Sequence, residues 1–240
     1  MIHNGFKSAR PLARLRQGRT DWYRIENSGN GPAEIYIYDE IGYVGVSAQD
    51  FVKDLNAIKA SEITLHLDTP GGDVYDGINI YNAIRDHKAH ITVIVDSMAA
   101  SAGSFIAQAG DTRIMNRNSE MMIRDAHTVA IGNSKDLAST AERLGKVSDN
   151  IASIYAERAG GTAAQWREAM AAETWYSAEE AVDAGLADEV VGKDAKASND
   201  FDLSIFSYAG REHAPAPIQE SAPELDWTAI AEALKGALTA

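Results

Sequence analysis

Cysteine is absent from this 240-residue chain, which excludes a disulfide framework and catalysis by a thiolate. Basic residues are too few to balance the acidic ones, and a net charge of -13 argues against general nucleic-acid binding. No run reaches about 18 consecutive apolar residues, so no membrane-spanning helix is predicted. The sequence contains no P-loop and no cluster of histidine and acidic metal ligands. It therefore predicts no metal, nucleotide or flavin cofactor.

Composition divides the chain into three segments. The first twenty residues carry basic side chains but no acid and no apolar core, which predicts a mobile arm over residues 1–32 and not a signal peptide. An arm that docks on an acidic partner is the alternative. Residues 33–191 carry regular apolar patterns and form the predicted domain. Residues 192–240 begin with polar and Ala-Pro-rich sequence and end with apolar residues at helical spacing, which predicts a linker and a short amphipathic helix.

Strand and helix patterns alternate within residues 33–191. Short apolar or β-branched runs predict strands at 34–38, 63–67, 91–95 and 121–123. Helical spacing and capping residues predict helices after Ser47, around 78–84, over 99–109, over 134–158, and after the capping boxes at Thr162 and Ser177. Repeated strand–helix units of this length predict an α/β fold with a mostly parallel sheet.

A Pro-Gly-Gly turn comes directly after the predicted strand at 63–67. Pro70 fixes the turn, and Gly71 and Gly72 let the backbone adopt positive φ and approach a ligand closely. Backbone amides exposed there, ahead of a helix, are suitable donors to a developing oxyanion. Most such turns only connect elements, so the significance of this one depends on the residues after the next strand.

A serine in a segment of small residues comes after the predicted strand at 91–95. Ser101 stands near the start of the predicted helix, where the helix dipole favours an alkoxide-like nucleophile and the amide of Ala102 can serve an oxyanion. Alternatively, the small residues merely allow close helix packing. From spacing alone, Ser97 and Ser104 are equal candidates.

Three segments together resemble the Clp protease proteolytic subunit and its phage relatives. They are residues 69–74 (Thr-Pro-Gly-Gly-Asp-Val), 99–105 (Ala-Ala-Ser-Ala-Gly-Ser-Phe) and 173–188 (Glu-Thr-Trp-Tyr-Ser-Ala-Glu-Glu-Ala-Val-Asp-Ala-Gly-Leu-Ala-Asp). Two further segments, residues 22–26 and 35–42, resemble the opening of the phage prohead or head-maturation proteases. The resemblance covers most of the predicted domain and implies a ClpP/crotonase-like fold.

The resemblance implies a serine peptidase site. Ser101 corresponds to the nucleophile of the family, and the amides of Gly72 and Ala102 correspond to its oxyanion hole. Glu173, which precedes Thr-Trp-Tyr-Ser, corresponds to the acid of the catalytic triad. Gly71 and Asp73, in the same turn as Gly72, are expected to contact the substrate.

The family's catalytic histidine comes directly after a Met-Ile strand, and this sequence has Arg124 there. A guanidinium stays protonated near neutral pH and cannot act as a general base. The nearest imidazole is His127, which we predict to be the base if the chain turns back toward Ser101. The other histidines lie within a strand, beside a strand connection or in the tails.

The resemblance implies an ATP-independent serine endopeptidase that cleaves a capsid or scaffold protein, forms a homo-oligomeric ring and works in the host cytoplasm or the procapsid. The helix over 134–158 resembles the element that joins such rings, although its apolar face could pack within its own subunit. Two alternatives stay open. In one, Arg124 disables the base and the protein is a structural or scaffold component. In the other, the chain is a crotonase-type acyl-CoA enzyme, which needs the oxyanion hole but no nucleophilic serine.

Overall fold

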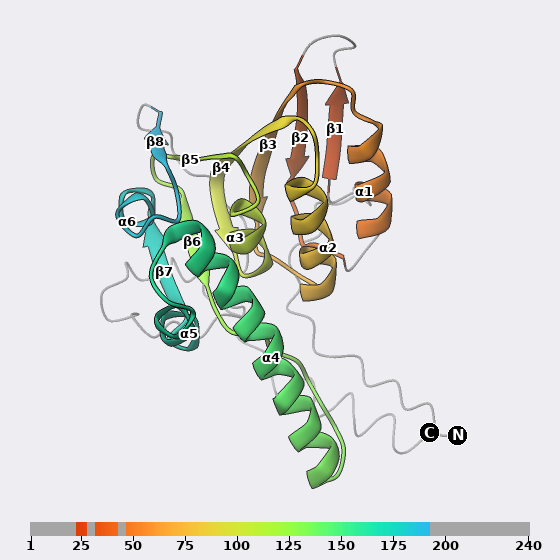
Figure 1. Ribbon diagram of the computed structural model, residues 1–240, viewed down its shortest axis with the longest axis vertical. Helices are drawn as coiled ribbons and strands as arrows, with labels where there is room; N and C mark the ends of the chain where they lie inside the picture. Colours follow the sequence, from red (N-terminus) through yellow and green to blue (C-terminus); the bar gives the residue numbers. More distant parts are fainter. Residues whose placement is uncertain (1–22, 28–31, 43–46, 193–240) are drawn as a thin grey trace, which may run out of the picture. The chain divides into compact units, whose positions relative to one another are not determined.

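The computed structural model describes residues 23–27, 32–42 and 47–192 (Figure 1). In this part of the chain the strands are β1 (Tyr23–Asn27), β2 (Ala33–Ile37), β3 (Glu62–Thr69), β4 (His90–Ala100), β5 (Thr112–Asn116), β6 (Glu120–Ile123), β7 (Thr174–Ser177) and β8 (Glu189–Val191). The helices are α1 (Ala48–Ala57), α2 (Val74–Arg85), α3 (Ala102–Ala107), α4 (Ser134–Ala159), α5 (Ala163–Ala171) and α6 (Ala178–Asp183). Most of the predicted arm, and the predicted linker and tail after Gly192, lie outside the described residues.

The strands form one mostly parallel sheet in the order β1-β2-β3-β4-β5-β8. The pairs from β2 to β8 along this path are parallel, and β1 runs antiparallel to β2. Strand β6 lies beside the end of β4 in parallel and pairs with β7 in antiparallel. The predicted α/β class with a mostly parallel sheet is confirmed.

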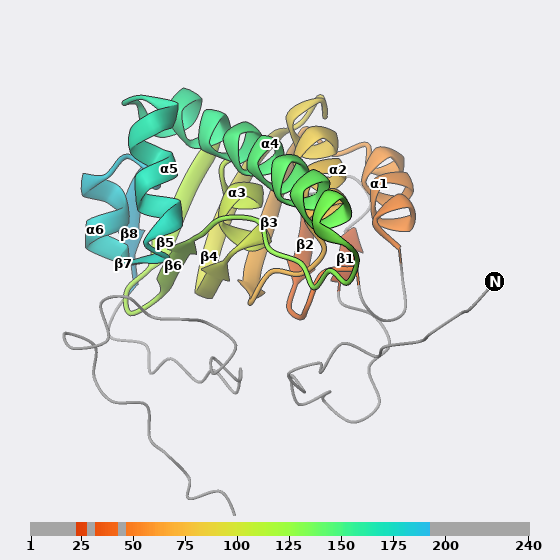
Figure 2. The same ribbon diagram turned by 90° about the horizontal axis from the view of Figure 1, so that it is seen from below.

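One face of the sheet carries the hydrophobic core. Along β3 the buried side chains alternate, with Ile63, Leu65 and Leu67 facing the core, as expected for a strand whose side chains have a period of two. Helix α1 contributes Phe51 and Leu55 to the same core. Figure 2 shows α1, α2 and α4 along one side of the sheet, so this core lies between the sheet and these helices.

Side-chain caps fix the beginnings of several helices where the sequence predicts them. Ser47 caps α1, Thr162 caps α5 and Ser177 caps α6, and each of the three forms a reciprocal capping box. Asn133 caps α4 in the same way. Each box satisfies amide donors that the first helical turn leaves without a partner within the helix.

Some elements differ from the prediction. Strand β1 lies inside the segment predicted as a mobile arm, because its backbone pairs with β2 over its whole length. The helix predicted over 99–109 begins only at Ala102, since Ala99 and Ala100 continue β4 and pair with Met121 and Met122 of β6. Strand β4 therefore ends directly before Ser101.

Helix α4 has two different halves. Its C-terminal half packs on the body through Ile151, Ile154 and Tyr155, whereas Leu137 near its beginning is 44% exposed. The N-terminal half and the segment leading into it reach away from the sheet (Figure 1). The predicted apolar face of this helix is thus buried within the subunit only over its second half.

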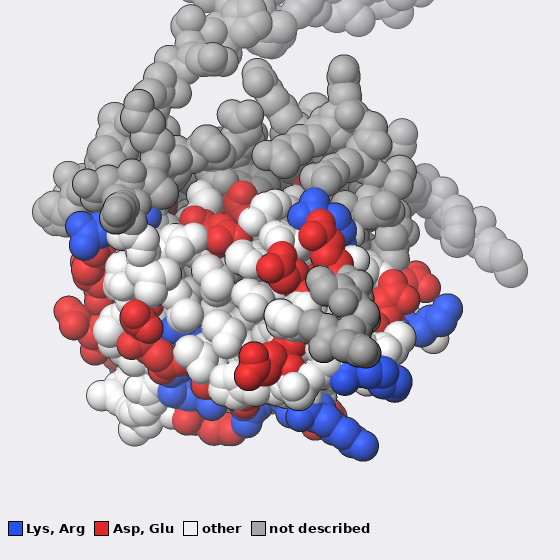
Figure 3. Space-filling view, turned by 90° about the horizontal axis from the view of Figure 1, so that it is seen from above, with Lys and Arg blue, Asp and Glu red and all other residues white. Residues whose placement is uncertain are grey.

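The surface carries both signs of charge. Figure 3 shows acidic and basic side chains interspersed around an uncharged centre on one face of the molecule. Among the helices that the structure describes, none has the length and apolarity needed to cross a bilayer.

Candidate active site

Ser101 lies at the junction of β4 and α3 in a strained backbone conformation. Its φ is 52° and its ψ is -115°, outside the regions that side-chain-bearing residues ordinarily adopt. The Ser101 amide donates a hydrogen bond to the Met122 carbonyl of β6 at 2.9 Å, which holds the junction in place. Such strain costs on the order of 1–3 kcal/mol and is concentrated at functional sites.

The structure distinguishes the three serines that the sequence leaves equivalent. Ser104 is fully buried, and its hydroxyl bonds to the Ser101 carbonyl and to the Tyr155 hydroxyl, at 2.5 and 2.8 Å. Ser97 belongs to β4 and does not line the pocket that opens beside Ser101. Ser101 is the one of the three that faces this pocket.

The Pro-Gly-Gly turn lies against Ser101, and two backbone hydrogen bonds with Ile41 hold it in place. The Ile41 amide donates to the Gly71 carbonyl at 2.7 Å, and the Ile41 carbonyl accepts from the Asp73 amide at 3.0 Å. Gly72 has a φ of 150°, and a Cβ there would lie 2.1 Å from the Ile41 carbonyl oxygen. Only glycine fits at this position without displacing the turn.

The amides of Gly72 and Ala102 make no hydrogen bond to any part of the chain that the structure describes. Both residues line the same pocket as Ser101. Two uncommitted amides beside a hydroxyl form the arrangement that an oxyanion hole requires. The carboxylate of Asp73, by contrast, accepts from the Tyr75 and Asp76 amides and caps α2, so its observed contacts are structural.

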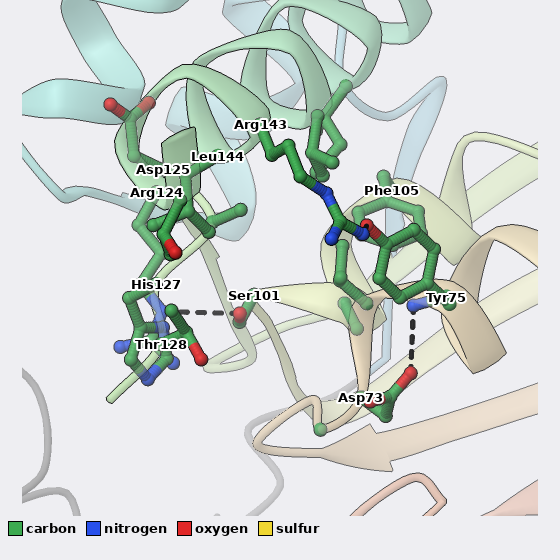
Figure 4. Close-up of a pocket in the computed structure, with 17 residues that line it drawn as sticks. Asp73, Tyr75, Ser101, Phe105, Arg124, Asp125, His127, Thr128, Arg143 and Leu144 are labelled. Atoms are coloured by element: carbon green, nitrogen blue, oxygen red, sulfur yellow. Dashed lines mark hydrogen bonds between the residues drawn. The ribbon is translucent and has the colours of Figure 1, made fainter. Parts of the chain in front are cut away.

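Arg124 reaches Ser101 directly. Its Nε donates a hydrogen bond to the Ser101 Oγ at 3.1 Å, as the dashed line in Figure 4 shows. On its other side, Nη1 of Arg124 lies 4.0 Å from Oε2 of Glu173. Both side chains are largely buried, at 12% and 15% exposure. The guanidinium thus occupies the space between the serine and the carboxylate, the position that a triad histidine would take.

The electrostatics of this pair result from burial. Burial lowers the pKa of Arg124, and the nearby Glu173 carboxylate acts in the opposite direction. Burial raises the pKa of Glu173, which the Arg124 charge partly offsets. Because a guanidinium is by far the most basic side chain, Arg124 keeps its proton despite this shift and accepts none from Ser101.

Glu173 is the second strained residue of the site. Its φ is 53°, and the only other non-glycine residue with positive φ in the described ranges, besides Ser101, is Asn118. Asparagine tolerates this conformation, whereas serine and glutamate do so less readily. The Oε1 atom of Glu173 is buried and has no hydrogen-bond partner among the described residues. Strain and an unsatisfied carboxylate oxygen therefore coincide at the predicted acid.

His127 lines the same pocket as Ser101 but makes no hydrogen bond to it within the described structure. Figure 4 shows His127 on the Arg124 side of the pocket. His127 is exposed overall, and the partial loss of solvent around its ring, together with the Arg124 charge, lowers its pKa. The imidazole is therefore neutral at pH 7, which is the state that accepts a proton.

A cavity of about 300 Å³ opens beside Ser101. Its walls include Phe105 of α3 and Leu144 and Val147 of α4, and Arg143 projects across it (Figure 4). The sequence did not single out Arg143, because helical spacing places it among solvated charges of the long helix. Within the described residues, no group of three or more His, Asp or Glu side chains is arranged to hold a metal ion.

Known proteins of one family match this chain. A protein-family model described as Clp protease matches residues 18–194. An ATP-dependent Clp protease proteolytic subunit from Deinococcus radiodurans is 32% identical over 185 residues, which cover 70% of this chain and 91% of that protein. Proteins of the same name from Streptococcus pyogenes and Streptococcus equi are 35% identical over 150 residues, which cover 61% of this chain and 72% of each relative.

Proposed function

The chain belongs to the Clp protease family, and from this premise we propose that it is an ATP-independent serine endopeptidase that cleaves capsid or scaffold proteins during phage head maturation. The observation that carries the peptidase assignment is the strained Ser101 at the pocket, beside the uncommitted amides of Gly72 and Ala102. A crotonase-type acyl-CoA reaction gains no support, because the matching family and the relatives are Clp proteases.

Ser101 is the proposed nucleophile. Its Oγ attacks the carbonyl carbon of the scissile peptide bond, and the developing oxyanion binds the amides of Gly72 and Ala102. Losing one such donor typically costs about 100- to 1,000-fold in rate, so the fixed geometry of the Ile41–Gly71 contact matters for catalysis.

In this mechanism Arg124 and His127 share two tasks that a single histidine performs in a catalytic triad: contact with the serine oxygen and acceptance of its proton. Arg124 donates to the Ser101 Oγ and stabilises negative charge on it as the proton leaves. His127 accepts that proton, since it lines the same pocket and its lowered pKa leaves the imidazole unprotonated at neutral pH. Glu173 lies on the side of Arg124 away from Ser101 and holds the guanidinium in position.

The acyl-enzyme then forms and breaks down in two steps. Protonated His127 returns its proton to the leaving amine, and the peptide bond breaks. A water molecule, deprotonated by His127, attacks the ester carbonyl, and the second tetrahedral intermediate collapses as His127 returns this proton to the Ser101 Oγ, which releases the acid product and restores the free enzyme.

The proposed substrate class rests on the resemblance of residues 22–26 and 35–42 to phage head-maturation proteases. We also propose a homo-oligomeric ring in the host cytoplasm or the procapsid. The exposed first half of α4, with Leu137, Val129 and Ile131 on or before it, supports contacts between copies.

A second candidate function is a structural component of a capsid assembly that keeps the fold without cleavage. The hydrogen bond from Arg124 to Ser101 favours it, because the group that touches the hydroxyl cannot take its proton.

Covalent labelling separates the two functions. A fluorophosphonate probe should label the full chain, and Ser101→Ala should abolish labelling. Ser97→Ala is the matched control, since Ser97 lies nearby in β4 but outside the pocket, and it should label like wild type. No labelling at any pH up to about 9 would favour the structural function. Incubation with procapsids, with mass spectrometry of the capsid and scaffold chains afterwards, tests the substrate class.

A further inference from the structure

We propose that Arg143 makes the pocket beside Ser101 selective for an acidic substrate side chain next to the scissile bond. This inference rests on the proposed peptidase function and adds the substrate chemistry of the same site. It concerns a residue that the peptidase reaction itself does not use.

Arg143 lies at the right place for this role. It belongs to α4, and Figure 4 shows its side chain extending across the pocket near Phe105 and Tyr75. Its Nη2 donates to the Tyr75 hydroxyl at 3.4 Å, a long hydrogen bond to a neutral group. The guanidinium therefore stands at the pocket wall with most of its donors free for a ligand.

The acids around the pocket contact other groups and not Arg143. Of the acids that line it, Asp73 is engaged with the first amides of α2, and Asp125 forms an ion pair with Arg167. The neighbouring Glu142 pairs with Lys146 one turn along α4, at 2.6 Å. No carboxylate among the described residues pairs with Arg143.

The pocket suits a glutamate or aspartate side chain in size and lining. A volume of about 300 Å³ accepts a side chain of this length, and Phe105, Leu144 and Val147 provide apolar walls for its methylene groups. The planar guanidinium matches a carboxylate with two parallel donors. A neutral isostere such as glutamine would lose the charge, and a lysine side chain would meet a like charge.

Peptide binding tests this without requiring turnover. Full-length Ser101→Ala protein is titrated with fluorescent peptides that differ only in one residue, glutamate, glutamine or lysine, and anisotropy gives each Kd. We expect the glutamate peptide to bind about fivefold more tightly than the glutamine peptide, as for a partly exposed charge-assisted pair, and the difference to shrink at high salt.

Variants on one helix provide the matched comparison. Adding Arg143→Gln should remove the preference for glutamate, and Arg143→Glu should reverse it in favour of lysine. Lys146→Gln removes one positive charge three residues away, outside the pocket, and should leave the preference unchanged. Equal binding of the glutamate and glutamine peptides, or a preference that survives Arg143→Gln, would overturn the proposal.

Cleavage by the wild-type chain separates this inference from the proposed function. Binding that prefers glutamate without cleavage of any peptide would sink the peptidase assignment and leave the acidic preference of the pocket standing. Cleavage with equal kcat/KM for glutamate and glutamine peptides would support the peptidase assignment and overturn the acidic preference of the pocket.

Discussion

Replacing Arg124 with histidine would put an imidazole between Ser101 and Glu173, where the structure holds a guanidinium. Arg124 Nε lies 3.1 Å from the serine oxygen, so a histidine at this position starts within reach of the proton that must be removed. Glu173, on the far side, would then stabilise the imidazolium that forms. We expect the variant to hydrolyse peptides faster than wild type.

The size of the gain depends on two opposing effects. A general base positioned at Ser101 contributes about 100- to 10,000-fold, and wild type has only part of this benefit because its proposed base, His127, makes no hydrogen bond to Ser101 in the described structure. Losing the charged hydrogen bond from Arg124 to the serine oxygen costs about 1.5 kcal/mol, or roughly tenfold. The net expectation is an increase of about 100-fold in kcat/KM, with a rate that rises with pH as the new imidazole loses its proton near its ordinary pKa of about 6.5.

The assay is peptide hydrolysis across pH 5 to 9, with Arg124→Gln as the matched control. Glutamine removes the guanidinium but supplies no base, so it should show no gain. If Arg124→His is no faster than wild type, Arg124 does not occupy the position of the base. If Arg124→Gln gains as much as Arg124→His, relief from the guanidinium is responsible and the base argument is wrong.

Two further predictions concern the turn and the proton acceptor. Gly72→Ala should lower kcat/KM by about 100-fold or more, because a Cβ there meets the Ile41 carbonyl at 2.1 Å and displaces an oxyanion donor. Gly145→Ala is its control, since a Cβ at that helical position meets nothing within 4 Å; a comparable loss there would contradict the argument. The acid limb of the wild-type pH profile should lie below pH 6.5, because the partial loss of solvent and the Arg124 charge lower the pKa of His127 and only the neutral imidazole accepts a proton. The limb should disappear together with most activity in His127→Ala, and an unchanged profile would exclude His127 as the base.

Much of the fold could be predicted from local patterns. The long helix α4 and the capping boxes at Thr162 and Ser177 arise from side-chain spacing, which acts within one or two turns. Strand β1 and the short strands β5, β7 and β8 could not be predicted in this way. Their existence depends on a neighbouring strand that supplies the hydrogen bonds.

The candidate site, like the fold, could be predicted from the sequence only in part. Sequence alone identified the Pro-Gly-Gly turn, the small-residue segment and an arginine where the family has histidine. Spacing alone left Ser97, Ser101 and Ser104 equivalent, because a run of small residues does not say where a strand ends, and only the family resemblance pointed to Ser101.

Tertiary structure separates the three serines, because Ser101 lines the pocket and the other two do not. Pairing of Ala99 and Ala100 with β6 extends β4 to Ala100, so the turn falls on Ser101. Pairing of β6 with β7, with Ile123 opposite Thr174, brings Glu173, distant in the chain, against Arg124. Contacts of this kind join residues far apart in sequence, so no local pattern encodes them, and only packing of the whole sheet with its helices fixes which charged group touches the serine.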